Sequence, residues 1–171
     1  MGNNFSNIID FTLVYNQNKK QLFNYIRKML DEKYMSEDIT QNVFLKLYEN
    51  LKNINKAQSV VSWLYTTARN EVYGYLRRKK IKSEDYIDEN IQYSSNDNLN
   101  IELENIEIRS IIENEIVNME EETKEIFILR HYSELSYGEI GNILGLNESL
   151  VKGRLFRARQ KLIDKVSKLV R

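Results

Sequence analysis

The sequence predicts an all-α protein made of two small helical domains that are joined by a flexible acidic linker. Proline is absent from the 171 residues, and no stretch shows the sustained period-two alternation of a half-buried strand. Apolar residues instead recur at spacings of three and four, which is the signal of amphipathic helices. We expect helices at residues 8–30, 37–51, 60–80, 106–118, 121–131, 137–144 and 148–169.

The helix expected at residues 37–51 has a start signal and a single apolar stripe. Ser36 precedes Glu37 and Asp38, which is the order of an N-cap followed by first-turn acids. The stripe consists of Ile39, Val43, Phe44, Leu47 and Leu51. Polar side chains beside the stripe could bind a partner, or the segment could be an ordinary amphipathic helix.

The helix expected at residues 60–80 mixes aromatic and cationic side chains. Rings stack on unpaired bases while cations contact phosphates, so the mixture is typical of single-stranded nucleic-acid binding. Trp63 instead has the spacing of a core residue. Both base stacking and core packing are open for Tyr65, Tyr73 and Tyr75. A cluster of cations at the helix end fits phosphate contacts, or a solvated helix terminus: Arg77, Arg78, Lys79 and Lys80.

The stretch 135–162 predicts a helix-turn-helix. Ser136 and Glu139 form a capping box, so we expect a helix to begin at Tyr137. Gly145 supplies the left-handed turn that other residues adopt only at a steric cost. Asn147 is a favourable N-cap for the second helix, whose first turn holds an acidic residue.

The second helix of this motif combines a buried stripe with many cations. We expect the stripe to be Leu150, Val151, Leu155, Ala158 and Leu162. The outer faces then carry Lys152, Arg154, Arg157, Arg159 and Lys161. Lys and Arg neutralise phosphates and recognise guanine, so the pattern predicts a helix that enters the DNA major groove. The alternative is a solvated basic helix on a helical bundle.

Charge is segregated along the chain although its formal net charge is zero. Residues 1–82 hold 14 Lys and Arg against 7 Asp and Glu, and residues 126–171 hold 9 against 4. Residues 83–125 hold 2 against 14. Two basic blocks around an acidic one suggest two DNA-facing domains joined by a segment that avoids DNA. We expect a linker between them, because the stretch between residues 82 and 105 is polar, acidic and rich in Asn and Ser.

Composition excludes several other classes of protein. The chain has no cysteine and a single histidine, which excludes disulfide scaffolds, zinc fingers and thiol nucleophiles. No nucleophile and base pair can be assembled, so we expect no catalytic residue, no metal and no cofactor. No apolar run approaches the ~20 residues of a spanning helix, and the N-terminus lacks the features of a secretory signal. The expected location is the cytoplasm.

Three motifs in order resemble the extracytoplasmic-function sigma factors, a class of the bacterial sigma-70 family. DITQNVFLKLYENL resembles the region 2.2 motif, and SWLYTTARNEVYGYLRRKK resembles regions 2.3 and 2.4. LSYGEIGNILGLNESLVKGRLFRARQKL resembles region 4.2. The resemblance implies a sigma region 2 domain at residues 1–82 and a sigma region 4 domain at residues 113–171, with the linker at residues 83–112 between them. It also implies a non-enzymatic initiation factor that binds core RNA polymerase, directs it to promoters and helps to open the duplex.

The resemblance also assigns residues to three binding surfaces. The clamp helices of the polymerase beta-prime subunit would be bound by Asp38, Gln41, Asn42, Phe44, Leu45 and Lys46. The minus-ten element would be bound by Ser62, Thr66, Arg69, Asn70, Tyr73, Arg77, Arg78, Lys79 and Lys80. The minus-thirty-five element would be bound by Asn147, Glu148, Ser149, Lys152, Arg154 and Arg157. The beta flap of the polymerase and a cognate anti-sigma factor are further partners that the resemblance implies.

The sequence departs from the family motif at Asn42, Gly74 and Gly153. A glycine inside a helix costs about 1 kcal/mol relative to alanine, and close approach to the DNA backbone is one explanation for Gly153. The alternative function is a stand-alone helix-turn-helix regulator that binds duplex DNA without polymerase. The two functions differ in whether the chain binds core polymerase.

Overall fold

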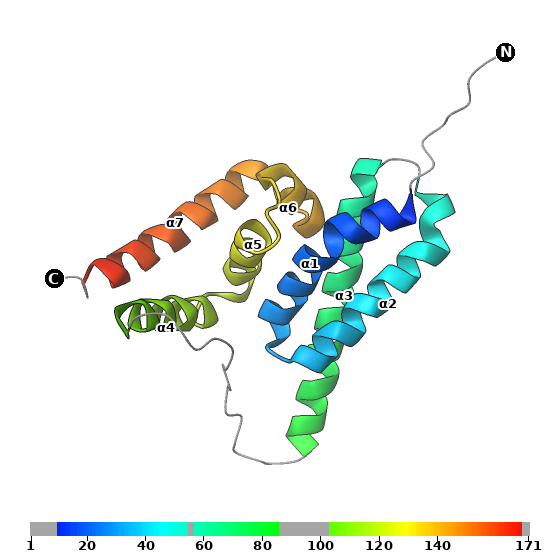
Figure 1. Cartoon of the computed structure of the whole chain (residues 1–171). Coiled ribbons are helices and arrows are strands. Elements are labelled where there is room, and N and C mark those ends of the chain that lie inside the picture. The colour runs from blue at the N-terminus through cyan, green and yellow to red at the C-terminus, as the bar shows by residue number, and fades with distance from the viewer. Residues whose placement is uncertain (1–9, 55–56, 86–102, 169–171) are drawn as a thin grey trace.

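The computed structural model describes residues 10–54, 57–85 and 103–168, and these residues confirm the all-helical prediction. The helices are α1 (Phe11–Leu30), α2 (Lys33–Asn50), α3 (Ala57–Asp85), α4 (Leu103–Val117), α5 (Glu121–His131), α6 (Tyr137–Leu144) and α7 (Glu148–Ser167), with a short 3-10 turn, η1 (Leu51–Asn53), after α2. Figure 1 shows α1 to α3 on one side of the molecule and α4 to α7 on the other. Within the described residues, no helix combines the length and apolarity that crossing a membrane requires.

Helices α1, α2 and α3 form the first bundle, because each has one apolar face. Asp10 caps α1 by accepting a hydrogen bond from the Thr12 amide at 2.8 Å. Asp31 ends α1 in the left-handed conformation at a φ of 57°, and the chain turns directly into α2. The inward faces contribute the following fully buried residues: Leu22, Tyr25, Ile26, Val43, Leu47, Leu64, Ala68 and Val72.

The predicted start of α2 is wrong. Ser36 is not the N-cap but lies buried inside the helix, which begins three residues earlier at Lys33. Its hydroxyl donates to the Glu32 carbonyl at 2.5 Å, one turn back along the helix. A serine satisfied in this way is compatible with a helix interior.

Helices α4 to α7 form the second group, and its local signals are confirmed. The capping box is present: Glu139 accepts from the Ser136 amide at 2.8 Å, and Ser136 accepts from the Glu139 amide. Gly145 ends α6 in the left-handed conformation at a φ of 70°. Asn147 caps α7 by accepting from the Leu150 amide at 2.8 Å.

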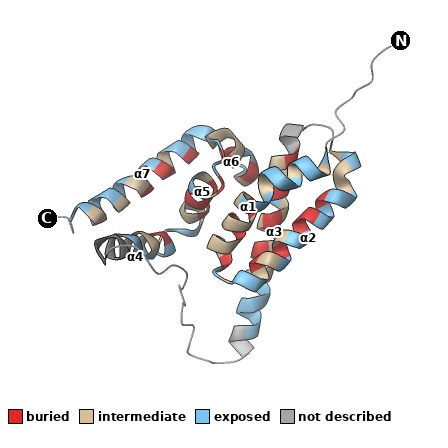
Figure 2. Cartoon of the chain, viewed as in Figure 1, coloured by how far each residue is buried: buried red, intermediate tan, exposed pale blue. Residues whose placement is uncertain are grey.

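The two groups pack against each other rather than standing apart. Buried residues from both form one continuous hydrophobic core, and the contacting pairs include α3 with α6 and α1 with α5. Figure 2 shows these buried faces directed towards one another, while the far end of α3 is exposed. Helix α3 ends at Asp85 and α4 begins at Leu103, so helices extend into both ends of the predicted linker. The rest of that linker, residues 86–102, lies outside the described residues.

Candidate nucleic-acid and polymerase interfaces

The start of α7 presents a polar face to solvent. Asn147, Glu148 and Ser149 are all exposed. Asn147 Oδ1 accepts from the Ser149 hydroxyl at 3.1 Å as well as from the backbone, so the cap orders the first turn. Glu148 forms an ion pair with Lys152 at 2.7 Å, one turn along the helix. This contact and the attraction to the helix dipole both favour the acidic residue where it stands.

The two arginines predicted to contact DNA have different surroundings. Arg157 is exposed to solvent. Arg154 is only 20% exposed and forms an ion pair with Glu122 of α5. Arg154 therefore holds α7 against α5, whereas Arg157 is available to an outside partner.

Two residues of the predicted α7 stripe are not fully buried. Leu150 is 36% exposed, while Val151, Leu155 and Ala158 are buried as expected and Leu162 is half-buried. The buried stripe therefore begins at Val151, one residue later than predicted.

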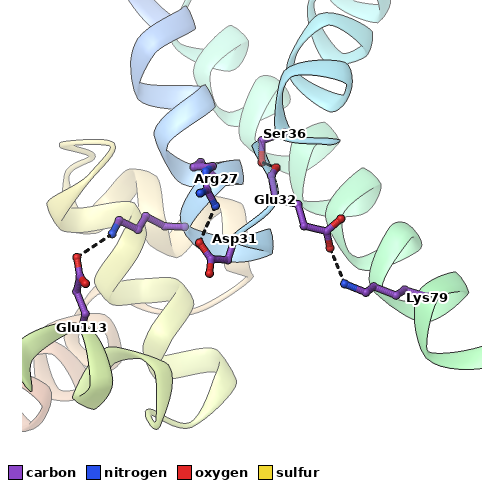
Figure 3. A network of polar contacts seen from close by, with 7 residues as sticks. Arg27, Asp31, Glu32, Ser36, Lys79 and Glu113 are labelled. Atoms are coloured by element: carbon purple, nitrogen blue, oxygen red, sulfur yellow. Dashed lines mark hydrogen bonds and ion pairs between the residues drawn. The ribbon is translucent and has the colours of Figure 1, made fainter. Parts of the chain in front are cut away.

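The candidate minus-ten residues on α3 fall into two groups. The exposed group consists of Thr66, Asn70, Arg77, Arg78, Lys79 and Lys80, and Ser62 is half-buried. Arg69 and Tyr73 are instead half-buried and engaged by the second group of helices. The exposed group is accessible to solvent in this arrangement, although Lys79 forms an ion pair with Glu32 at 2.6 Å (Figure 3).

A buried glutamate of α5 binds Arg69 and Tyr73. The Glu125 carboxylate accepts from Arg69 Nε at 3.0 Å, from the Tyr73 hydroxyl at 3.0 Å and from the Tyr25 hydroxyl at 2.7 Å. We call these four residues the Glu125 cluster. Burial, followed by the negative charge of Glu125, raises the pKa of Tyr25 and that of Tyr73. Both phenols therefore stay protonated and donate to the carboxylate.

The structure decides where the other aromatic residues of α3 lie. Tyr65 is buried, with its ring 5.6 Å from that of Tyr25, and burial raises its pKa to about 12. The Tyr75 hydroxyl donates to Glu32 at 2.7 Å. Trp63 packs against the core as a partly buried residue, in keeping with its predicted spacing. Burial therefore removes Tyr65 from base stacking, whereas Trp63 and Tyr75 are half-buried.

Most of the predicted polymerase face of α2 is exposed. Asp38, Gln41, Asn42, Leu45 and Lys46 all lie on the solvent side, and Leu45 is 57% exposed. Phe44 is only 3% exposed, and its ring packs 4.8 Å from that of Tyr15. The structure therefore places Phe44 in the core of the first bundle, so it cannot contact the polymerase directly in this arrangement.

Two residues that matter to the fold, Glu125 and Gly141, were not predicted from the sequence. Glu125 stands next to the apolar run IFIL, and a buried carboxylate there indicates a partner from elsewhere in the fold. Gly141 lies inside α6, and the structure shows why a glycine stands there: the backbone of Leu146 in the following turn lies too close for a Cβ atom. A glycine at this position of a helix-turn-helix signals a close helix approach, which could have been inferred.

Comparison with known proteins agrees with this geometry. The family Sigma-70 region 2 matches residues 14–81, and the family Sigma-70, region 4 matches residues 109–162. The E. coli K12 ECF RNA polymerase sigma-E factor is 31% identical over 146 residues, which cover 78% of this chain and 75% of the relative. The Bacillus subtilis ECF RNA polymerase sigma factor SigM is 26% identical over 152 residues, covering 87% and 90%.

A solved structure shows the same fold. It is the sigma factor RpoE in complex with the anti-sigma factor NepR from Bartonella quintana, with a TM-score of 0.72 at 20% identity, covering 92% of this chain and 97% of that one. The chain belongs to the extracytoplasmic-function sigma factors of the sigma-70 family. It is accordingly a DNA-binding initiation factor that directs RNA polymerase to promoters, and not an enzyme.

Proposed function

We propose that the chain binds a two-part promoter through two separate faces. The exposed residues of α3 bind the minus-ten element, and the first turns of α7 bind the minus-thirty-five element. The observation that supports this is the distribution of exposure. On each helix the predicted polar and cationic residues are mostly exposed, and the buried side of the helix is formed by apolar or aromatic residues: Val60, Leu64, Tyr65, Ala68 and Val72 on α3, and Val151, Leu155 and Ala158 on α7.

The proposed division of labour follows from the chemistry of each face. On α7, Asn147, Ser149, Lys152 and Arg157 combine hydrogen-bonding groups with cations, which suits base edges and phosphates of a duplex. On α3, the exposed cations at the C-terminal end suit phosphates, and Thr66 and Asn70 suit unpaired bases. The binding free energy at α3 offsets the few kcal/mol that unstacking each base costs.

The polymerase-binding face in this proposal is α2. Asp38, Gln41, Asn42, Leu45 and Lys46 bind the clamp helices of the beta-prime subunit, and residues 113–171 meet the beta flap. The domains span residues 1–82 and 113–171, with the linker at 83–112. The protein acts in the cytoplasm and is a candidate for control by a cognate anti-sigma factor, the kind of partner that RpoE has in the Bartonella quintana complex.

Run-off transcription tests the proposal. Promoters are first obtained by sequencing the transcripts that appear on overexpression, and transcription is then reconstituted with core polymerase. Asn70→Ala should reduce open-complex formation, and Ser149→Ala should weaken binding of the closed complex. Lys19→Ala, an exposed change on α1 at a residue that belongs to none of the proposed faces, is the matched control. Wild-type activity of both test variants would contradict the proposed faces.

A further inference from the structure

The Glu125 cluster joins the two halves of the molecule through one buried carboxylate. Glu125 lies in α5 and its side chain is 1% exposed. All three residues that donate to it lie in the other half: Tyr25 in α1, and Arg69 and Tyr73 in α3. A buried carboxylate is tolerated only when charge or hydrogen bonds compensate it. Its compensation here depends on the two halves staying together.

A second ion pair between the two halves has its charges arranged as in the Arg69–Glu125 pair. Lys28 Nζ of α1 lies 3.8 Å from Oε1 of Glu113 in α4, the glutamate labelled in Figure 3. The same ammonium lies 5.0 Å from the ring centroid of Tyr132. Arg69 also stacks over the Tyr73 ring at 5.0 Å. In the Arg69–Glu125 and Lys28–Glu113 ion pairs the first bundle supplies the cation, and the second group of helices supplies the carboxylate. This complementarity stabilises one closed arrangement of the halves.

The closed arrangement occupies two of the residues proposed to bind the minus-ten element. Arg69 Nε and the Tyr73 hydroxyl donate to Glu125, and the Tyr73 ring is covered on one side by Arg69. The neighbouring Thr66 and Asn70 remain exposed. While Glu125 accepts these hydrogen bonds, Arg69 Nε and the Tyr73 hydroxyl are not available to a nucleic acid.

We propose that Glu125 is an internal competitor of the minus-ten element: its carboxylate occupies Arg69 and Tyr73 in the free chain, and DNA binds them only after the two halves separate. The proposal rests on the proposed role of α3 in minus-ten binding. It makes the free chain a poor ligand for single-stranded promoter DNA. Binding to core polymerase, by drawing the halves apart, then supplies the competent α3 face.

The proposal is tested by measuring the separation of the halves in solution. Since the chain has no cysteine, Lys19→Cys on α1 and Gln160→Cys on α7 accept a pair of fluorophores at two exposed positions. Glu125→Gln should lengthen the distance between the dyes. Glu115→Gln is the matched control, because it removes a carboxylate whose ion pair with Lys165 lies within the second group of helices.

The second readout is binding of the free chain to DNA. The probe is a labelled single-stranded oligonucleotide of the nontemplate minus-ten strand, from the promoter used in the run-off assay. If the closed form outnumbers the open form by about ten to one, release of the two residues raises the apparent affinity about tenfold. We expect that gain in Glu125→Gln and no gain in Glu115→Gln.

A second variant covers the case in which Glu125→Gln fails to fold. Tyr25→Phe removes the 2.7 Å hydrogen bond from α1, and Tyr25 is not among the residues proposed to bind DNA. It should lengthen the dye distance and raise affinity in the same direction. An unchanged distance in every folded variant, or a longer distance with no gain in affinity, overturns the proposal.

Failure of the competition can be distinguished from failure of the minus-ten assignment. Asn70 is exposed and is not a member of the Glu125 cluster. If Asn70→Ala lowers oligonucleotide affinity while Glu125→Gln does not raise it, α3 binds the DNA but Glu125 does not compete. If Asn70→Ala and Arg69→Gln also leave affinity unchanged, the minus-ten assignment itself is wrong.

Discussion

Gly141 of α6 lies directly against the backbone of Leu146 in the turn between the two helices. A Cβ atom at position 141 would lie 2.5 Å from the Leu146 carbonyl oxygen, a separation that real Cβ atoms do not adopt. The Leu146 amide also donates to the Gly141 carbonyl at 2.9 Å, so the turn is bound at this point.

Gly141→Ala should destabilise the fold, because the atom that it meets belongs to the backbone and cannot rotate away. Overpacking of this kind costs about 1–3 kcal/mol. Urea unfolding followed by circular dichroism measures the change. Gly138→Ala is the control, since its Cβ would meet only the end of the Glu148 side chain at 3.8 Å. Equal stability of the two variants would contradict the steric account.

Gly153→Ala should have the opposite effect on stability. Position 153 lies within α7, and nothing lies within 4 Å of where a Cβ would stand. Alanine should stabilise the helix by about 1 kcal/mol. If the glycine is there to let the DNA backbone approach, the same variant binds minus-thirty-five duplex more weakly. A variant that is more stable and binds DNA as well as the wild type would rule out that reason for Gly153.

Arg154 and Arg157 should separate stability from DNA binding. Arg154→Ala removes the ion pair with Glu122 and should lower stability by about 1 kcal/mol, a value limited by solvent screening. Arg157→Ala should change stability by less than about 0.5 kcal/mol. If Arg157 contacts a phosphate, its loss weakens duplex binding and reduces the salt slope by about one.

Duplex binding at increasing salt should also be measured for Arg154→Ala, because the sequence motif predicts that Arg154 contacts DNA. A lower affinity with an unchanged salt slope would show that its role is to hold α7 in place. A slope that falls as much as in Arg157→Ala would show that Arg154 leaves Glu122 to meet the DNA.

Stability should fall as pH rises above about 10, the pKa of a tyrosine in an unfolded chain. Burial and the charge of Glu125 raise the pKa of Tyr25 and Tyr73 in the folded chain. The unfolded state therefore binds fewer protons in this range and is favoured as pH rises. Urea unfolding on both sides of that pKa measures the loss. Tyr25→Phe should reduce it, and Tyr34→Phe, at a side chain 82% exposed, is the control.

Local signals predicted the second group of helices better than the first. The bounds of α5 and α6 and the start of α7 agree with the prediction, because the capping box, Gly145 and Asn147 act within a few residues of themselves. The start of α2 was misplaced because Ser36 has the residue type of a cap but donates to the backbone of the preceding turn. Residue type alone does not distinguish these two uses of a serine.

The function of the acidic block was only partly predictable. Segregated charge indicated that residues 83–125 avoid DNA, and residues 83–112 were interpreted as a linker. The structure places two of these acids, Glu113 and Glu125, on helices that contact cations of the first bundle. Contacts between residues 52 to 100 positions apart leave no periodic pattern in the sequence. The closed arrangement of the halves could therefore be recognised only from the three-dimensional structure.

Site-specific photo-crosslinking in the initiation complex tests the central claim most directly. A photoreactive amino acid replaces Asn70 on α3 or Ser149 on α7, and the chain is assembled with core polymerase on a promoter labelled on either strand. We predict that position 70 crosslinks to the minus-ten nontemplate strand and position 149 to the minus-thirty-five duplex. Crosslinks from both positions to one element, or from position 70 to polymerase alone, would contradict the two-face account.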